Sequence, residues 1–174
     1  MQGMAIWFDR VVRLISVCLA SISASLLLFL FIIIQYEVVM RFAFNAPTDW
    51  TNEVSTFAIS WVGFLGAGYV LRLGRQLEID VITMRLSEKA CRIVGTTTDA
   101  VGAMFSAYIA YLGYEFTRVA WLMSATSASE LDTPLWIPYL TIPIGFGVLS
   151  LEFVARICWR WGAVDRPQAE HMAI

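Results

Sequence analysis

The sequence alternates long uncharged stretches with short charged ones, and this pattern predicts helices that cross a membrane. Residues 14–36, between Arg13 and Glu37, contain no charged side chain. As a helix that rises 1.5 Å per residue, they reach about 34 Å, which exceeds the roughly 30 Å hydrocarbon core of a bilayer. A helix that is apolar on every face does not suit the surface of a soluble domain. We therefore expect residues 14–36 to span a membrane.

Three further stretches predict additional spans. Residues 54–71 and residues 133–151 are uncharged between their flanking charged residues, whereas residues 93–117 include Asp99. If Asp99 lies near one face of the membrane, it is either solvated there or in polar contact with another helix. Together the four spans predict an all-α membrane protein that forms a single domain over residues 1–174.

The distribution of basic residues orients these spans. With four spans, the N-terminal segment, the connection between the second and third spans and the C-terminal tail share one side of the membrane. That side holds ten Lys and Arg residues, and the other side holds two. Cytoplasmic segments carry an excess of basic residues, so we expect both termini in the cytoplasm and residues 42–53 and 118–132 outside. Residues 77–86 mix apolar and charged side chains, which predicts a short amphipathic segment on the cytoplasmic surface.

Composition excludes several classes of function. The 174 residues are 59% hydrophobic and 15% charged, with a net charge of −2, so the chain has no basic surface for nucleic acid. Its three cysteines are far apart in the sequence, without a Cys-x-x-Cys pair, and His171 is its single histidine. The cysteine spacing argues against a disulfide framework or a redox pair, and the single histidine excludes bis-histidine haem ligation within the chain. We expect no catalytic residue, no cofactor and no metal site.

The densest polar cluster follows the first span, in residues 35–53. Glu37 and Arg41 are four positions apart, so their side chains can pair on a helix. Glu53 falls in the predicted first turn of the next helix, where the helix dipole favours an anion. Trp50 suits the membrane interface. The cluster is therefore either a short join between two helix ends or part of an interface with a partner.

These residues, and several later ones, resemble a known family. The order Val38-x-x-Arg41-Phe42-x-Phe44, then Trp50-x-x-Glu53, then Trp61 and Gly66 before Arg72 is similar to that of the small membrane subunit of tripartite ATP-independent periplasmic (TRAP) transporters. The later Leu135-x-x-Pro138-Tyr139 and Pro143-x-Gly145 resemble the fourth helix of that family. The resemblance covers roughly residues 10–160.

The resemblance implies a non-catalytic scaffold subunit in the bacterial inner membrane. In such transporters a large permease subunit carries the substrate with sodium, and a periplasmic substrate-binding protein delivers the substrate, typically an organic acid. The small subunit braces the large one and helps to dock the binding protein. Arg72 is expected at the inner headgroup layer, in contact with lipid or with a partner. Candidates for interface or structural roles are Arg41, Trp50, Glu53, Trp61, Arg72 and Gln76.

Other classes of four-span protein fit less well. A self-sufficient small multidrug exporter needs a carboxylate within its first helix, and the first span has none before Glu37 at its end. A membrane anchor of a redox enzyme lacks its paired cysteines and haem histidines here. A generic four-helix membrane adaptor with different partners is the remaining alternative.

Overall fold

The structure is all-helical over the residues that it describes. The computed structural model describes residues 2–46, 48–73, 88–129 and 131–161. They form α1 (Gln2–Ala43), α2 (Asp49–Arg72), α4 (Glu88–Leu122), α5 (Trp136–Tyr139) and α6 (Thr141–Arg160). Within these ranges the only β-type pairing is an isolated bridge between Thr126 and Pro134. The predicted all-α class is therefore confirmed.

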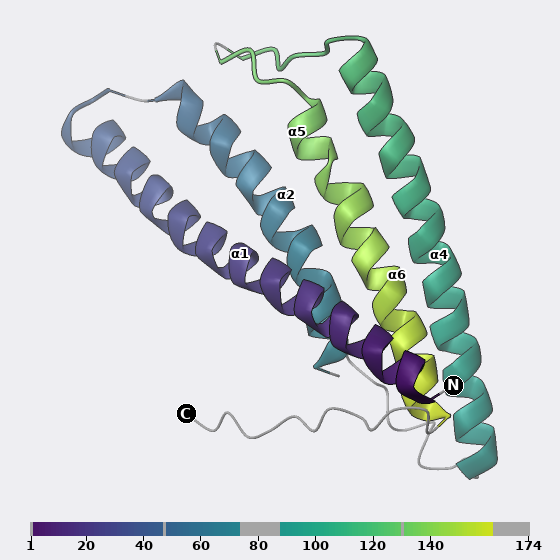
Figure 1. Cartoon of the computed structure of the whole chain (residues 1–174). Helices are drawn as coiled ribbons and strands as arrows, with labels where there is room; N and C mark the ends of the chain where they lie inside the picture. The colour runs from purple at the N-terminus through teal and green to yellow at the C-terminus, as the bar shows by residue number, and fades with distance from the viewer. Residues whose placement is uncertain (1, 47, 74–87, 130, 162–174) are drawn as a thin grey trace.

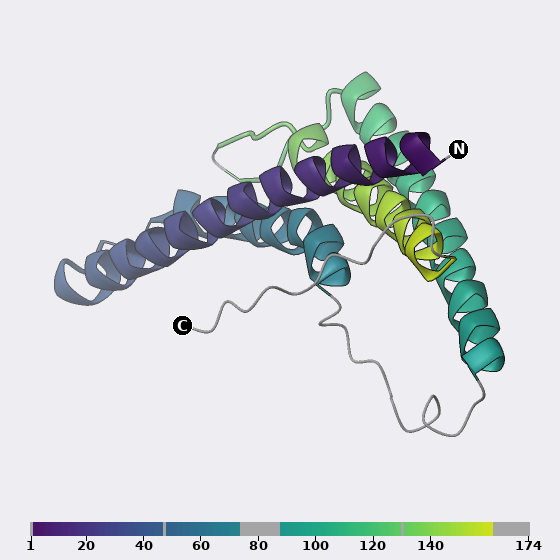
Figure 2. The ribbon, with the colours of Figure 1, turned by 60° about the horizontal axis from the view of Figure 1, so that its bottom comes forward.

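The long helices pack in the order α1, α2, α6, α4 (Figure 1). α1 is antiparallel to α2 and α4 is antiparallel to α6, whereas α2 and α6 run in the same direction. The connection between α1 and α2 and the connection between α4 and α5, residues 123–135, lie at one end, which we call the loop end. Gln2 and Trp161, the first and last described residues, lie at the opposite end, which we call the terminal end. In Figure 2, α1 runs obliquely past α2 toward α6.

Three helical segments are long and apolar enough to cross a membrane, namely Ala5–Ala43, Trp50–Arg72 and Trp136–Arg160. They include the predicted spans 14–36 and 54–71 and most of the span 133–151. α4 includes the predicted span 93–117 but is not one of these three segments, because its polar residues, among them Asp99 and several threonines and tyrosines, make it less apolar than they are. These three apolar helices indicate that the chain is a multi-pass membrane protein.

α1 is much longer than the span predicted within it. Its 42 residues correspond to about 63 Å of helix. The prediction placed the ends of the span at Arg13 and Glu37, yet both residues lie inside the helix. Charged residues end the apolar stretch without ending the helix, because they are good helix formers when their side chains reach water or a partner.

The last predicted span, 133–151, is shifted in the structure and contains a break. Residues 133–135 belong to the connection, and the helical segment runs from Trp136 to Arg160 with an interruption at Leu140. Pro143 has no N–H to donate to the carbonyl of Tyr139, four residues earlier. α5 ends at Tyr139, so the break lies where proline removes that hydrogen bond.

Glycines allow the helices to approach closely where they cross. A Cβ atom at Gly145 of α6 would lie 2.5 Å from the carbonyl oxygen of Phe64 in α2. A Cβ at Gly102 of α4 would lie 2.8 Å from the ring of Phe153 in α6. Close backbone approach through small residues is a main source of helix packing in lipid. Gln76 and the amphipathic segment predicted at residues 77–86 lie outside the described residues.

Candidate functional site

Arg72 is the centre of a buried charge network at the terminal end. Its Nε lies 2.9 Å from Glu152 Oε1 on α6, and its Nη2 lies 2.8 Å from Asp9 Oδ1 on α1. The side chains of Arg72 and Glu152 are 4% and 0% exposed. Removing such charges from water is costly unless they pair with good geometry. One guanidinium group therefore joins α1, α2 and α6.

Neighbouring polar and aromatic groups extend this network. The hydroxyl of Ser16 on α1 donates a hydrogen bond to Glu152. The guanidinium carbon of Arg72 lies 4.9 Å from the ring centroid of Trp159, a cation–π distance. The indole Nε1 of Trp159 donates to Asp9 Oδ1 at 3.0 Å. A Cβ at Gly68 of α2 would lie 3.7 Å from Ser16 Oγ and 3.7 Å from Glu152 Cγ. The backbone of α2 therefore lies close to both of these residues.

A second network at the same end joins α4 to α6 through Asp99. Arg160 Nη2 lies 2.8 Å from Asp99 Oδ2, and Arg156 Nε lies 3.5 Å from Asp99 Oδ1. Gly95 leaves room for this pairing, because a Cβ there would lie 2.1 Å from Arg160 Nη1. Of the two environments expected for Asp99, solvation at the membrane face or contact with another helix, the structure shows the interhelical contact.

The two networks balance each other in charge. Together they contain three carboxylates and three guanidinium groups, which are Asp9, Asp99, Glu152, Arg72, Arg156 and Arg160. α6 contributes three of the six groups, all in its last turns. α6 is therefore attached to α2 and α4 by ion pairs at the terminal end, and to α1 by the hydrogen bonds of Ser16 and Trp159.

At the loop end, Glu37 ties the end of α1 to the start of α2. Its Oε1 pairs with Arg41 Nη2 at 2.8 Å, as the four-residue spacing predicted. Its Oε2 accepts hydrogen bonds from the hydroxyls of Thr48 and Thr51, at 2.9 Å for Thr51, and from the backbone N–H of Thr48 at 3.3 Å. Nearby, the rings of Trp50 and Tyr36 lie 6.2 Å apart. The side chain of Arg41 is 60% exposed and so points to the surroundings.

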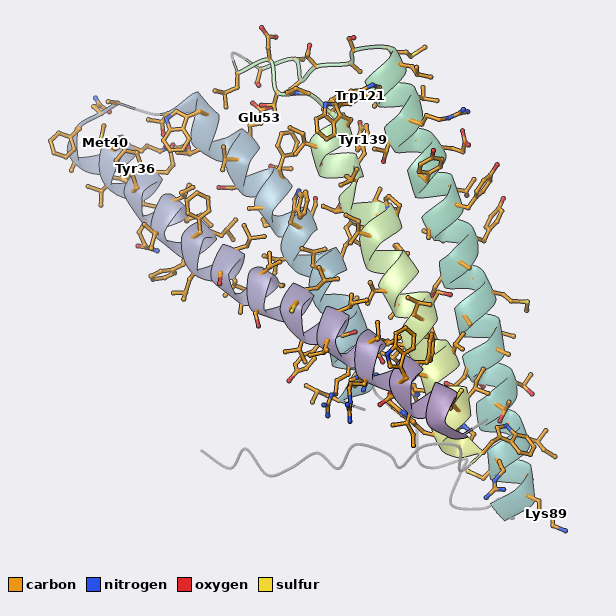
Figure 3. All side chains as sticks on the ribbon, in the orientation of Figure 1. Tyr36, Met40, Glu53, Lys89, Trp121 and Tyr139 are labelled. Carbon is orange, nitrogen blue, oxygen red and sulfur yellow. The ribbon has the colours of Figure 1, made fainter. Side chains whose placement is uncertain are left out.

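Glu53 connects α2 to the loop between α4 and α5. The hydroxyl of Ser129 donates a hydrogen bond to its carboxylate, and Glu53 is buried. Figure 3 shows Glu53 near this loop, at the opposite end of the molecule from Lys89. The loop is ordered by backbone hydrogen bonds from Ser127 N to Thr133 O and from Leu135 N to Ala125 O, both at 2.9 Å.

The structure distributes the predicted site residues over separate places. Arg41, Trp50 and Glu53 lie at the loop end, and Arg72 lies at the terminal end. Trp61 is half-buried between them on α2. Arg72 was expected to face lipid or a partner, but its burial places it inside the helix assembly. Gln76 is not among the described residues.

Sequence reasoning missed Asp9, Ser16 and Glu152 as partners of Arg72. Glu152 served only as the charged residue that ends the last uncharged stretch, and Asp9 had no assigned role. One signal was present in the sequence: in the predicted four-span topology, Arg72 and Glu152 both fall at the cytoplasmic boundary. Opposite charges at one membrane depth are candidates for pairing.

Comparison with known proteins identifies the family of this helix assembly. The family model described as "Tripartite ATP-independent periplasmic transporters, DctQ component" matches residues 30–162, which is most of the chain. The chain belongs to this TRAP transporter family.

Individual relatives agree with this assignment. The chain is 32% identical over 105 residues to the C4-dicarboxylate TRAP transporter small permease protein DctQ of Rhodobacter capsulatus, covering 60% of this chain and 46% of that protein. It is 24% identical over 160 residues to the protein of the same description from Vibrio cholerae, covering 79% and 68%. A match to the isethionate TRAP transporter permease protein DctMQ of Oleidesulfovibrio alaskensis is 25% identical over 126 residues and covers 69% of this chain but 19% of that protein. The aligned part thus spans about half of the R. capsulatus TRAP subunit.

The family match and these relatives identify the chain as a TRAP small membrane subunit, as the resemblance in the sequence implied. These relatives are transporter permease subunits and not enzymes. The DctMQ relative carries the segment that matches this chain within one much longer permease chain.

Proposed function

We propose that this chain is the non-transporting scaffold of a TRAP transporter, bracing a large permease subunit in the bacterial inner membrane. The observation that carries the proposal is how the chain uses its buried charges. In transport pathways, ionisable groups inside the membrane mark the route of the substrate or ion. Here the charged groups of the two networks at the terminal end pair with one another between helices. Such pairs hold helices in fixed positions, as a support requires.

The proposal places α4 across the membrane as the fourth span. α4 packs against α6, antiparallel to it (Figure 1). The ten basic residues expected on one side, against two on the other, favour this arrangement with both termini in the cytoplasm. The loop end then faces the periplasm.

The loop end is suited to dock the periplasmic substrate-binding protein. In the sequence of residues 37–53 and 115–136, six carboxylates accompany two arginines. The exposed Asp132 lies in the loop that hydrogen bonds order and that Ser129 fastens to Glu53. Segments whose sequence carries excess negative charge favour a partner with a complementary positive patch. We assign the transport of the substrate, an organic acid moved together with sodium, to the large subunit, so this chain needs no cofactor of its own.

Co-purification and uptake test the proposal together. The tagged chain is expected to bring down a large permease subunit from detergent-solubilised membranes, and cells without the chain are expected to lose uptake of the organic acid. The proposal is wrong if uptake persists without the chain and no large permease co-purifies. Recovery of unrelated membrane proteins instead would favour the generic four-helix adaptor.

A further inference from the structure

The exposed face of α4 carries tyrosines in the middle of the helix. Tyr108 and Tyr111 are each 60% exposed, and Met104 and Phe105 on the same face are 67% and 62% exposed. The hydroxyl groups of Tyr108 and Tyr111 have no hydrogen-bond partner among residues 2–46, 48–73, 88–129 and 131–161. In water such hydroxyls would be hydrated, but this helix belongs to a membrane protein.

Three features of α4 indicate how deep the tyrosines lie. Asp99 is paired with arginines at the terminal end, and Trp121 packs edge-to-face against α5 at the loop end, with ring centroids 4.8 Å apart. The exposed ion pair of Glu115 with Arg118 also lies toward the loop end of α4. Tyr108 follows Asp99 by nine residues and precedes Glu115 by seven, or about 14 Å and 10 Å along the helix. Both distances are longer than a tyrosine side chain, so the hydroxyl of Tyr108 cannot reach either charged group by snorkelling, whereas Tyr111 lies one helical turn before Glu115.

A hydroxyl at that depth needs a partner that lipid cannot offer. Acyl chains have no hydrogen-bonding groups, and an unpaired polar group in hydrocarbon is costly. The exposed face of α1 differs in this respect, because its large exposed side chains at comparable positions are hydrocarbon only. They include Leu27, Leu28, Phe31 and Ile32, exposed by 56–64%. The α1 face suits lipid, and the α4 face suits protein.

The composition of α4, to which these tyrosines contribute, points the same way. α4 is the one long helix among the described residues that is not apolar enough to be a candidate span by itself. A helix with lipid on its free side should be apolar there, whereas a less apolar helix is stable in a bilayer when protein covers it. One side of α4 is already covered by α6, so the free side requires a further protein.

We propose that this free face of α4 binds the large permease subunit. The α4 face, as we define it, consists of Met104, Phe105, Tyr108, Tyr111 and Leu112. The hydroxyls of Tyr108 and Tyr111 donate to polar groups of a partner helix, since interhelical hydrogen bonds in membranes form between such groups. The exposed face of α1 remains in contact with lipid. This inference rests on the proposed scaffold function, because it requires that a large subunit is bound.

Site-specific photocrosslinking tests the α4 face directly. The photoreactive residue p-benzoylphenylalanine replaces Tyr108 or Tyr111 in one set of variants and Leu28 or Phe31 of α1 in a matched control set, each co-expressed with the tagged large permease. We expect a covalent adduct with the permease from both α4 positions and from neither α1 position. Adducts from α1 alone, in a complex that still co-purifies, overturn the inference and leave the scaffold function intact. If no permease co-purifies with the unsubstituted chain, the scaffold function itself fails, and this inference fails with it.

Removal of the hydroxyls tests the hydrogen bonds separately. The double variant Tyr108→Phe with Tyr111→Phe keeps both rings and removes only the polar groups. We expect it to lower the affinity for the permease about five- to tenfold, as two interhelical hydrogen bonds in a membrane would. The control is Tyr36→Phe at the loop end of α1, which is expected to change the affinity less than twofold. Equal affinities of the double variant and the control contradict the proposed hydrogen bonds.

Discussion

At the scale of single residues, the assembly of the helices depends on Arg72. This side chain is buried, contacts Glu152 on α6 and Asp9 on α1, and lies against the ring of Trp159. A buried arginine keeps its charge, so its carboxylate partners must remain in place to compensate for it. The network therefore fixes the relative positions of three helices through one side chain.

Glu152→Gln tests the importance of this network. The substitution keeps the shape of the side chain but removes the charge that faces Arg72. We expect a loss of about 3 kcal/mol or more in the free energy of unfolding, because one partner of a buried ion pair is removed. Thermal unfolding of the purified chain in detergent measures the effect.

Glu115→Gln is the matched control, because it breaks an ion pair that is exposed. Glu115 and Arg118 lie 2.7 Å apart with side chains 34% and 54% exposed. Pairs of this kind contribute at most about 1 kcal/mol. If both variants unfold at the same temperature, the buried network does not stabilise the helices in the way described here.

Local pairings could be predicted from the sequence, whereas distant ones could not. The ion pair of Glu37 with Arg41 follows from a four-residue spacing on one helix, and the structure confirms it. The ion pair of Arg72 with Glu152 joins residues 80 positions apart. No periodicity in the sequence encodes which faces of α2 and α6 meet, so this pairing required the three-dimensional structure.

At the scale of helices, the crossing of α2 and α6 depends on Gly145. A side chain there would meet the backbone of Phe64, and a backbone atom cannot move aside as a flexible side chain can. Gly147, two positions later on α6, has open space around it, because no atom of a neighbouring helix lies within 4 Å of the place that a Cβ would occupy. The two glycines therefore make a matched pair of test sites on one helix.

Gly145→Ala is expected to destabilise the chain, and Gly147→Ala is not. Overpacking at Gly145 should cost about 1–3 kcal/mol of unfolding free energy. Alanine at Gly147 should be neutral or stabilising by up to about 1 kcal/mol, because alanine favours helix more than glycine does. Unfolding of both variants in the same detergent measures the difference. Equal stability would show that α2 and α6 are not in the close contact seen in the structure.

The helices themselves were largely predictable, and their limits were less so. Uncharged stretches located the central parts of α1, α2 and α6, because a segment without charged side chains is the kind of segment that is stable in the hydrocarbon core of a bilayer. The extension of α1 to Gln2 could not be read from apolar residues, since Asp9 is held there by tertiary contacts with α2 and α6. The break at Leu140 follows from Pro143, but its place depends on hydrogen bonds that only a structure shows.

At the scale of the whole molecule, charge distinguishes the two ends. The terminal end holds most of the basic residues, and the loop end carries excess carboxylates. This difference supports the proposed orientation in the membrane, with the basic end toward the cytoplasm. In that proposed orientation the loop between α4 and α5 lies where a periplasmic protein can reach it.

Reporter fusions test this orientation and the crossing of α4. A green fluorescent protein fused after Glu88, at the start of α4, or after residue 174 is expected to fluoresce, because the proposed topology places its site in the cytoplasm. Alkaline phosphatase fused after Ala125, beyond α4, is expected to be active, because its site is periplasmic. If the fusions before and after α4 report the same side of the membrane, α4 does not cross it and the four-span topology is wrong.

Reconstitution into liposomes tests the central claim that this chain supports a transporter without carrying solute itself. Liposomes with an inward sodium gradient receive this chain alone, the large permease alone or both subunits, and the substrate-loaded binding protein is added outside. The scaffold function predicts substrate uptake only when both subunits are present, with no flux above protein-free liposomes for this chain alone. Sodium-driven uptake by this chain without the large permease would contradict it.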